Sequence, residues 1–96
     1  IVIVLNNSGY GTERLLHPGE WEFNEIPQWQ YQNLPDVLGG GTGYEVFTEG
    51  DFDRALLDAW QDTTGPSILH VHLDRNDASE ALKRLGVKMS ETVETR

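Results

Sequence analysis

Hydrophobic residues are arranged along the chain in three patterns that predict strands. Residues 1–5 (IVIVL) are all apolar and mostly β-branched, which predicts a strand buried on both faces of a parallel sheet. Residues 44–48 alternate between apolar and polar positions, and residues 67–73 (SILHVHL) form a further apolar-rich run. The chain is therefore expected to contain three strands, the first of them at its beginning.

The segments between these strands carry helical patterns. Thr12 is a candidate N-cap for a short helix that follows it, and Gly86 is a candidate C-terminal stop for the last helix. Residues 18–33 combine large apolar side chains with Pro, Asn and Gln, which favours an ordered loop. The predicted helices span residues 13–16, 33–38, 52–62 and 77–85. This order predicts an α/β fold, a three-layer parallel sheet with helical crossovers and helices on both faces.

The position of the first strand bears on domain organisation. A strand buried on both faces needs neighbours beside it and helices above and below, yet this one starts at residue 1. We therefore expect the chain to be the C-terminal part of a larger domain, with residues 1–86 as the domain portion and 87–96 as a fraying tail. A chain of 96 residues buries little surface, so we expect it to need the rest of its protein or a partner chain to stay folded.

Composition narrows the function classes. A formal charge of −9 leaves no basic stripe to neutralise phosphates, which argues against nucleic acid as a partner. The absence of cysteine excludes disulfides, zinc fingers and thiol catalysis within this chain, and it fits a cytoplasmic protein. No apolar run approaches the length that spans a membrane, so no membrane partner is expected.

The best candidate ligand site follows the first strand, at Asn6-Asn7-Ser8-Gly9. Polar groups on such a turn lie at the carboxyl edge of a parallel sheet, where open α/β folds bind ligands. Side-chain amide and main-chain carbonyl oxygens suit Mg²⁺ or Ca²⁺, and main-chain N–H groups in a glycine turn suit phosphate. The alternative is an ordinary strand-to-helix turn, in which Asn and Gly are common.

Other candidate groups have simpler explanations. Glu13 is either an acidic residue that complements a helix dipole or a proton-transfer group beside a cofactor. His70 and His72 share one strand face, but no third metal ligand follows at useful spacing, so a half-covered strand explains them better. His17 adjoins the presumed site as a turn residue. The glycine-rich run at residues 39–43 lacks the Gly-Lys-Ser/Thr ending of a phosphate loop and is expected to be a flexible connection.

Taken together, residues 1–17 (IVIVLNNSGYGTERLLH) and 23–29 (FNEIPQW) resemble a known family. They are similar to the C-terminal cofactor domain of thiamine-diphosphate-dependent 2-oxo acid decarboxylases, in particular pyruvate and indolepyruvate decarboxylases. Asn6-Asn7 matches the closing half of the family's metal and diphosphate motif. The Gly-Asp-Gly that opens this motif is not in the chain, nor are the family's activating glutamate and paired histidines, which lie in another domain.

The resemblance implies roles for individual residues. Asn7 would give its side-chain oxygen to Mg²⁺ and Gly9 its main-chain carbonyl. Tyr10 and its neighbours would contact the diphosphate through the main chain. Glu13 matches a glutamate beside the thiazolium that assists decarboxylation and proton transfer. Thr12 falls at a substrate-pocket position that is often apolar, and together with Gly11 this departure leaves the preferred 2-oxo acid open.

The resemblance thus implies an enzyme that uses thiamine diphosphate and Mg²⁺ to convert a 2-oxo acid into an aldehyde and CO₂. The cofactor accepts the electrons released with CO₂, and the protein contributes orientation, Mg²⁺ anchoring and proton transfer. Homodimers or homotetramers are typical of the family. Two alternatives stay open, namely a carboligase of the acetolactate synthase type and a fragment with only a structural role. The isolated chain is expected to be inactive in either case.

Overall fold

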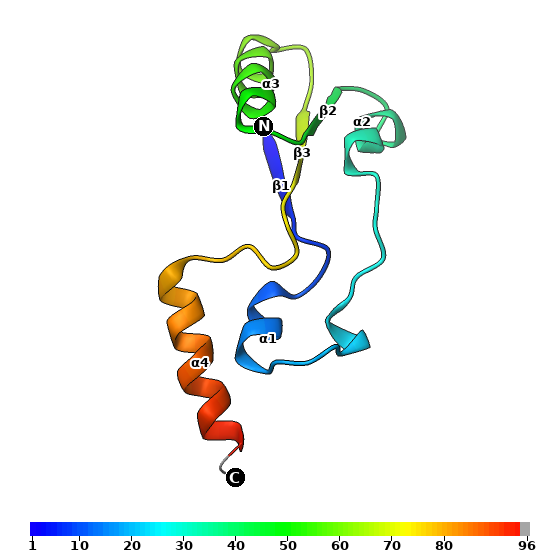
Figure 1. The fold of residues 1–96 in the computed structure, drawn as a ribbon. Coiled ribbons are helices and arrows are strands. Elements are labelled where there is room, and N and C mark those ends of the chain that lie inside the picture. The colour runs from blue at the N-terminus through cyan, green and yellow to red at the C-terminus, as the bar shows by residue number, and fades with distance from the viewer. Residues whose placement is uncertain (95–96) are drawn as a thin grey trace. The chain divides into compact units, whose positions relative to one another are not determined.

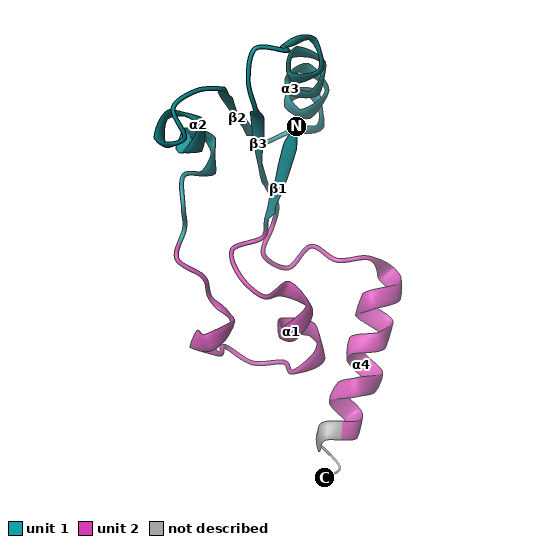
Figure 2. Ribbon diagram, turned by 180° about the vertical axis from the view of Figure 1, so that it is seen from behind, with its two compact units in different colours: residues 1–6, 28–73 teal, residues 7–27, 74–96 magenta. Residues whose placement is uncertain are grey.

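The computed structural model describes residues 1–94 (Figure 1). The chain divides into two compact units, coloured separately in Figure 2. Unit 1 consists of residues 1–6 and 28–73, and unit 2 consists of residues 7–27 with the C-terminal residues from 74 onward. Residues 95 and 96, the end of the predicted tail, lie outside the described residues.

Unit 1 contains a three-stranded parallel sheet. Its strands are β1 (Val2–Asn6), β2 (Thr42–Val46) and β3 (Ser67–His72). The order across the sheet is β1-β3-β2, and both pairings are parallel. In register, β3 residue His70 lies between Val4 and Glu45. The predicted α/β class, the three strands and their parallel direction are confirmed.

Helical segments cover both faces of this sheet. The helix α3 (Glu49–Gln61) packs on one face through a buried cluster of small and branched side chains, namely Val46, Ala55, Ala59 and Leu69. Its first turn is closed by a capping box between Thr48 and Asp51. On the opposite face, the 3₁₀ turn η2 (Tyr31–Asn33) contacts His70, and the short helix α2 (Leu34–Val37) follows it. The predicted three-layer arrangement is therefore present within unit 1.

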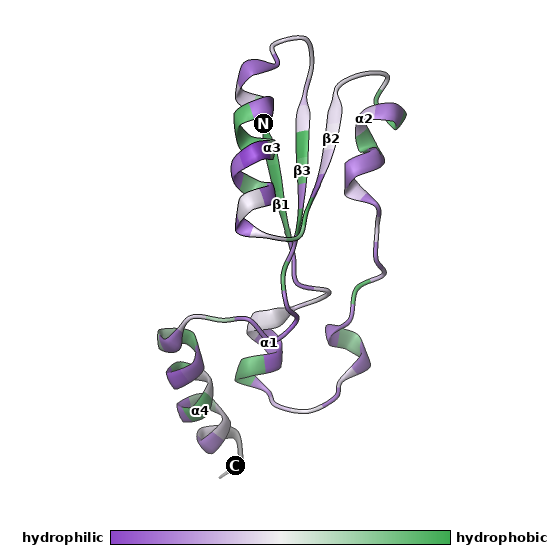
Figure 3. Ribbon diagram, turned by 45° about the horizontal axis from the view of Figure 1, so that its top comes forward, coloured by the Kyte–Doolittle hydropathy of each residue, from purple (hydrophilic) through white to green (hydrophobic). Residues whose placement is uncertain are grey.

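Strand β1 departs from its predicted burial. Within the described structure it pairs with β3 alone and occupies the edge of the sheet. Val2 and Leu5 keep 52% and 65% of their surfaces exposed, and the strand is hydrophobic along most of its length (Figure 3). The prediction that β1 is buried on both faces is wrong for the described residues, because an edge strand has neighbours on one side only.

Unit 2 contains the helices α1 (Gly11–Leu16) and α4 (Glu80–Glu94) and the 3₁₀ turn η1 (Glu22–Asn24). The helix α1 begins one residue before Thr12, and no side chain caps it, so the prediction of Thr12 as N-cap is wrong. The loop predicted at residues 18–33 is ordered where it enters this unit. Trp21 stacks on Phe23 with ring centroids 5.8 Å apart, and its indole N–H donates to the Pro18 carbonyl.

The C-terminal helix is longer than predicted. We expected Gly86 to end it and residues 87–96 to fray, but α4 continues through Gly86 to Glu94. Gly86 is buried, and a Cβ added to it would lie 2.7 Å from the main-chain oxygen of Leu15 on α1. The glycine therefore permits close approach of the two helices, which a sequence pattern does not distinguish from a helix stop.

We expect Gly86→Ala to destabilise the protein, although alanine is normally the better helix former. The added methyl group forces α1 and α4 apart, at a cost of about 1–3 kcal/mol in the free energy of unfolding. Gly50→Ala in α3 is the matched control, since the nearest atom to its added Cβ is 3.5 Å away. This control should be neutral or stabilising by up to about 1 kcal/mol. Denaturant unfolding measures both, and equal effects would contradict the helix-contact role of Gly86.

Candidate functional site

The five residues predicted for the site lie together in unit 2, in the turn after β1 and the first turns of α1. They are Asn7, Gly9, Tyr10, Thr12 and Glu13. The turn between them has unusual backbone angles, with φ of 65° at Ser8 and 156° at Gly9. A side chain at Gly9 would overlap the Asn24 carbonyl oxygen and the Arg14 guanidinium, so this position requires glycine both for its φ and for space.

The turn is held by the segment that contains η1. The Tyr10 N–H donates to the Asn24 carbonyl oxygen at 2.9 Å, and Gly9 forms an isolated antiparallel bridge with Glu25. Asn24 is 2% exposed, and its side-chain nitrogen has no hydrogen-bond partner among the described residues. The Tyr10 carbonyl accepts from the Arg14 N–H at 3.1 Å. Both main-chain polar groups of Tyr10 are thus hydrogen-bonded within unit 2.

Asn7 is half-buried, and its amide lies against Gly11. A Cβ added to Gly11 would be 2.5 Å from the Asn7 side-chain nitrogen. Gly11, which departs from the decarboxylase pattern, therefore has a local structural reason, because it leaves room for the Asn7 amide. Because the side-chain nitrogen of Asn7 faces Gly11, the side-chain oxygen is the amide atom that is left to bind a metal ion. That oxygen and the Gly9 carbonyl are the hard donors that Mg²⁺ prefers.

The neighbouring side chains on α1 are accessible. Thr12 and Glu13 are exposed, as is the ring of Tyr10. Glu13 therefore places an exposed carboxylate in the first turn of α1, directly after the turn that carries the oxygen donors. The residues present in the turn thus fit a magnesium-bound phosphate compound in donor chemistry.

Two residues of this region were missed by sequence analysis. Arg14 and Glu25 are held beside the turn by hydrogen bonds, and neither stood out in a pattern, because the contacts join segments about ten residues apart through an irregular loop. Glu25 belongs to the FNEIPQW stretch used for the resemblance, without a role of its own. Only the folded loop brings it to Arg14.

The histidines of β3 form a different cluster, in unit 1. Donor atoms of Glu45, His70 and His72 lie within 4.8 Å of one another. The expectation that no third ligand is near the two histidines is therefore wrong, because Glu45 comes from the adjacent strand, directly opposite His70. Both ring nitrogens of His70, however, already have partners: the Asn6 amide nitrogen at 2.8 Å and the Gln32 side-chain oxygen at 2.8 Å.

These partners fix the state of His70. The Asn6 amide donates, so Nε2 accepts, and the protonated Nδ1 donates to Gln32. A neutral, doubly hydrogen-bonded imidazole that is 3% exposed is typical of a structural histidine. We therefore assign the cluster to the hydrogen bonding of the sheet, and imidazole nitrogens are in any case poor ligands for Mg²⁺.

Burial lowers the pKa of His70 below its ordinary value of 6.5, with the nearby His72 adding to this effect and Glu45 opposing it. As the pH falls, the unfolded chain takes up the proton first, so the folded state loses stability below about pH 6.5 and keeps it above. One proton limits the slope to about 1.4 kcal/mol per pH unit. Denaturant unfolding at a series of pH values measures the free energy of unfolding of the wild type and of His70→Gln. The two free energies should converge as the pH falls.

The matched control is His17→Gln, because His17 is exposed at the end of α1. The free energy of unfolding of this variant should change with pH in parallel with that of the wild type. A His70→Gln curve that also stays parallel would contradict the stated role of the buried imidazole.

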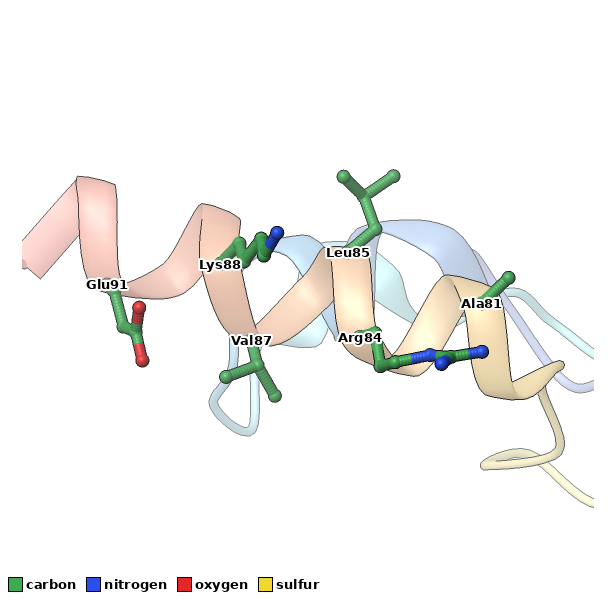
Figure 4. Close-up of a pocket in the computed structure, with 6 residues that line it drawn as sticks. All are labelled: Ala81, Arg84, Leu85, Val87, Lys88 and Glu91. Carbon is green, nitrogen blue, oxygen red and sulfur yellow. The ribbon is translucent and has the colours of Figure 1, made fainter.

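A hollow on unit 2 runs along α4, but it is not a candidate ligand site. All its lining residues come from this one helix: Ala81, Arg84, Leu85, Val87, Lys88 and Glu91 (Figure 4). Leu85 and Val87 point to opposite sides of the helix in this view. The hollow is therefore an open helix surface without convergent polar groups. Among the described helices, none has both the length and the apolar character needed to cross a bilayer.

Comparison with known proteins identifies relatives. No protein-family model matches the chain. It is 35% identical over 88 residues to a pyruvate decarboxylase of Aspergillus fumigatus, covering 86% of this chain and 15% of that protein. It is 27% identical over 90 residues to a probable pyruvate decarboxylase of Schizosaccharomyces pombe, covering 90% of this chain and 15% of that protein.

An alpha-keto-acid decarboxylase of Mycobacterium avium is 30% identical over 87 residues, covering 88% of this chain and 16% of that protein. The chain thus spans about 15% of the length of the relatives it matches. These relatives share decarboxylation in their names, whether they are fungal or bacterial.

Proposed function

Because this chain belongs by sequence to the pyruvate and alpha-keto-acid decarboxylases, of which it matches one segment, we propose that it holds the cofactor of such an enzyme. The intact protein would convert a 2-oxo acid of the pyruvate, phenylpyruvate or indolepyruvate type into an aldehyde and CO₂. The observation that carries this proposal is the Asn7–Gly9 turn followed by an exposed Glu13 on α1. A cytoplasmic homodimer or homotetramer belongs to the same proposal.

Thiamine diphosphate, when bound, supplies the electron sink for the loss of CO₂. Asn7 would hold Mg²⁺ through its side-chain oxygen and Gly9 through its main-chain oxygen. Phosphate oxygens of the cofactor would supply further ligands to the ion. Because Tyr10 already uses its N–H and its carbonyl within unit 2, main-chain contact with the diphosphate falls to its neighbours in the turn. Tyr10 would contribute its exposed ring beside the cofactor.

Glu13 is the proposed catalytic residue. Its carboxyl group, in the first turn of α1, would give a proton to the substrate carbon that loses CO₂ and would then be reprotonated from solvent. Thr12, exposed on the same short helix, would line the substrate pocket. A hydroxyl group at this position offers a hydrogen bond that an apolar residue lacks, so it bears on which 2-oxo acid is preferred.

The test is an assay of the intact protein with thiamine diphosphate, Mg²⁺ and pyruvate, phenylpyruvate or indolepyruvate. Release of CO₂ with an equal amount of free aldehyde supports the proposal. A hydroxyketone or acetohydroxy acid as main product would replace it with the carboligase alternative. No CO₂ from any of the three substrates, in a sample that binds the cofactor, would reject it.

A further inference from the structure

Arg14, which has no role in the proposed site so far, makes two hydrogen bonds to the Asn7-Ser8-Gly9 turn. Its guanidinium Nη1 donates to the Asn7 carbonyl oxygen at 3.0 Å, and Nη2 donates to the Ser8 carbonyl oxygen at 2.9 Å. A further bond from Nη1 reaches the Arg75 carbonyl oxygen at 2.9 Å. The side chain is only 9% exposed. A buried cation is thus committed to two consecutive carbonyl groups of the turn.

The charge of Arg14 is balanced locally. Glu25 Oε1 lies 3.4 Å from Arg14 Nη2 and 2.5 Å from an Arg75 guanidinium nitrogen, so one carboxylate serves both arginines. This partner matters because a buried charge without one is strongly destabilising. Arg14 Nε is buried and has no hydrogen-bond partner among the described residues. The contribution of Arg14 to holding the turn therefore comes from its two Nη atoms.

The two hydrogen bonds from Arg14 to carbonyl oxygens determine the direction in which the peptide groups of the turn point. In a trans peptide, the N–H points opposite to the C=O, and no described peptide bond is cis. Fixing the carbonyls of Asn7 and Ser8 toward Arg14 therefore directs the N–H groups of Ser8 and Gly9 to the other side of the turn. Consecutive N–H groups that point the same way form an arrangement that binds anions.

The hydrogen bonds from Arg14 to the carbonyl oxygens of Asn7 and Ser8 also offset strain in the backbone of the turn. Ser8 has a φ of 65°, a left-handed conformation that is strained for a residue with a side chain. Such a conformation persists only where its surroundings enforce it. The planar fork of a guanidinium spans two neighbouring oxygens at once, whereas the ammonium of lysine is a single point with no fixed fork.

From these contacts we propose that Arg14 is a positioning residue for the cofactor. It holds the Asn7-Ser8-Gly9 turn so that the Asn7 amide and the Gly9 carbonyl are set for Mg²⁺ and the N–H groups for the diphosphate. This inference rests on the proposed function. Arg14 makes no contact with substrate or cofactor in this role, and the Glu25 carboxylate is the counter-ion that Arg14 shares with Arg75.

The experiment measures binding of thiamine diphosphate to the intact protein at saturating Mg²⁺, by titration calorimetry. Arg14→Lys keeps the charge and removes the fork, and it should weaken binding about 10–100-fold, as outer-shell changes at metal sites do. The matched control is Arg84→Lys, because Arg84 lies exposed on α4 in the same unit, and its one hydrogen bond among the described residues goes to a main-chain oxygen of its own helix. This control should bind as the wild type does.

A rescue measurement separates positioning from general stability. In Arg14→Ala, added guanidinium ion at low millimolar concentration should restore part of the lost affinity, whereas equal concentrations of ammonium ion should not. Arg14→Lys with wild-type affinity would overturn the inference, and so would equal rescue by both ions. Should Arg14→Ala fail to fold, Arg14→Lys decides alone. Wild-type protein that does not bind thiamine diphosphate would instead overturn the proposed function.

Discussion

Glu13→Gln should lower the turnover of the intact enzyme by about 100-fold to 10,000-fold, the range that a positioned acid or base contributes. The substitution keeps the size and hydrogen-bonding capacity of the side chain but removes its ability to exchange a proton at neutral pH. Glu13 is exposed on α1 and makes no side-chain bond that holds the turn among the described contacts, so the fold should be unaffected. Steady-state release of CO₂ measures the effect.

Cofactor affinity provides the control for this prediction. Because Asn7 and Gly9, not Glu13, would hold Mg²⁺, the Glu13→Gln protein should bind thiamine diphosphate as the wild type does. A matched variant is Glu22→Gln, which removes an exposed carboxylate from η1 in the same unit and should leave turnover unchanged. Lost cofactor binding with normal chemistry in Glu13→Gln would contradict the catalytic role.

Gly9→Ala should abolish cofactor binding under conditions that saturate the wild type. The added methyl group overlaps the Asn24 carbonyl oxygen and the Arg14 guanidinium, and an L residue at a φ of 156° is strained, at a cost of about 1–3 kcal/mol. The turn then shifts, and with it the carbonyl proposed as a Mg²⁺ ligand. Calorimetric titration with thiamine diphosphate and Mg²⁺ measures the loss.

Gly40→Ala is the control for Gly9→Ala. Gly40 has no atom within 4 Å of an added Cβ, and its φ lies outside the positive range. This variant should bind cofactor normally and unfold at the wild-type denaturant concentration. Normal cofactor binding by Gly9→Ala would show that the turn tolerates a side chain and would remove Gly9 from the proposed site.

Much of the fold follows from local sequence. The runs at residues 1–5 and 67–73 became parallel strands, because β-branched and apolar residues without helical spacing favour extended backbone. The helix predicted at residues 52–62 is present as α3, since its apolar residues recur at helical spacing and Thr48 caps it. The Asn-Asn-Ser-Gly turn and the position of Glu13 shortly after it were likewise visible in the sequence, whereas the exposure of Glu13 came from the structure.

What the sequence could not determine depends on contacts between distant segments. Gly86 has the pattern of a helix stop, and only the oxygen of Leu15 beside it explains why a helix continues through a glycine. Glu45 reaches the histidines through strand register, and Arg14 reaches the turn and Glu25 through an irregular loop. Local propensity determines which element forms, but packing and hydrogen bonds across the chain decide which side chains meet, and therefore which residue positions the site.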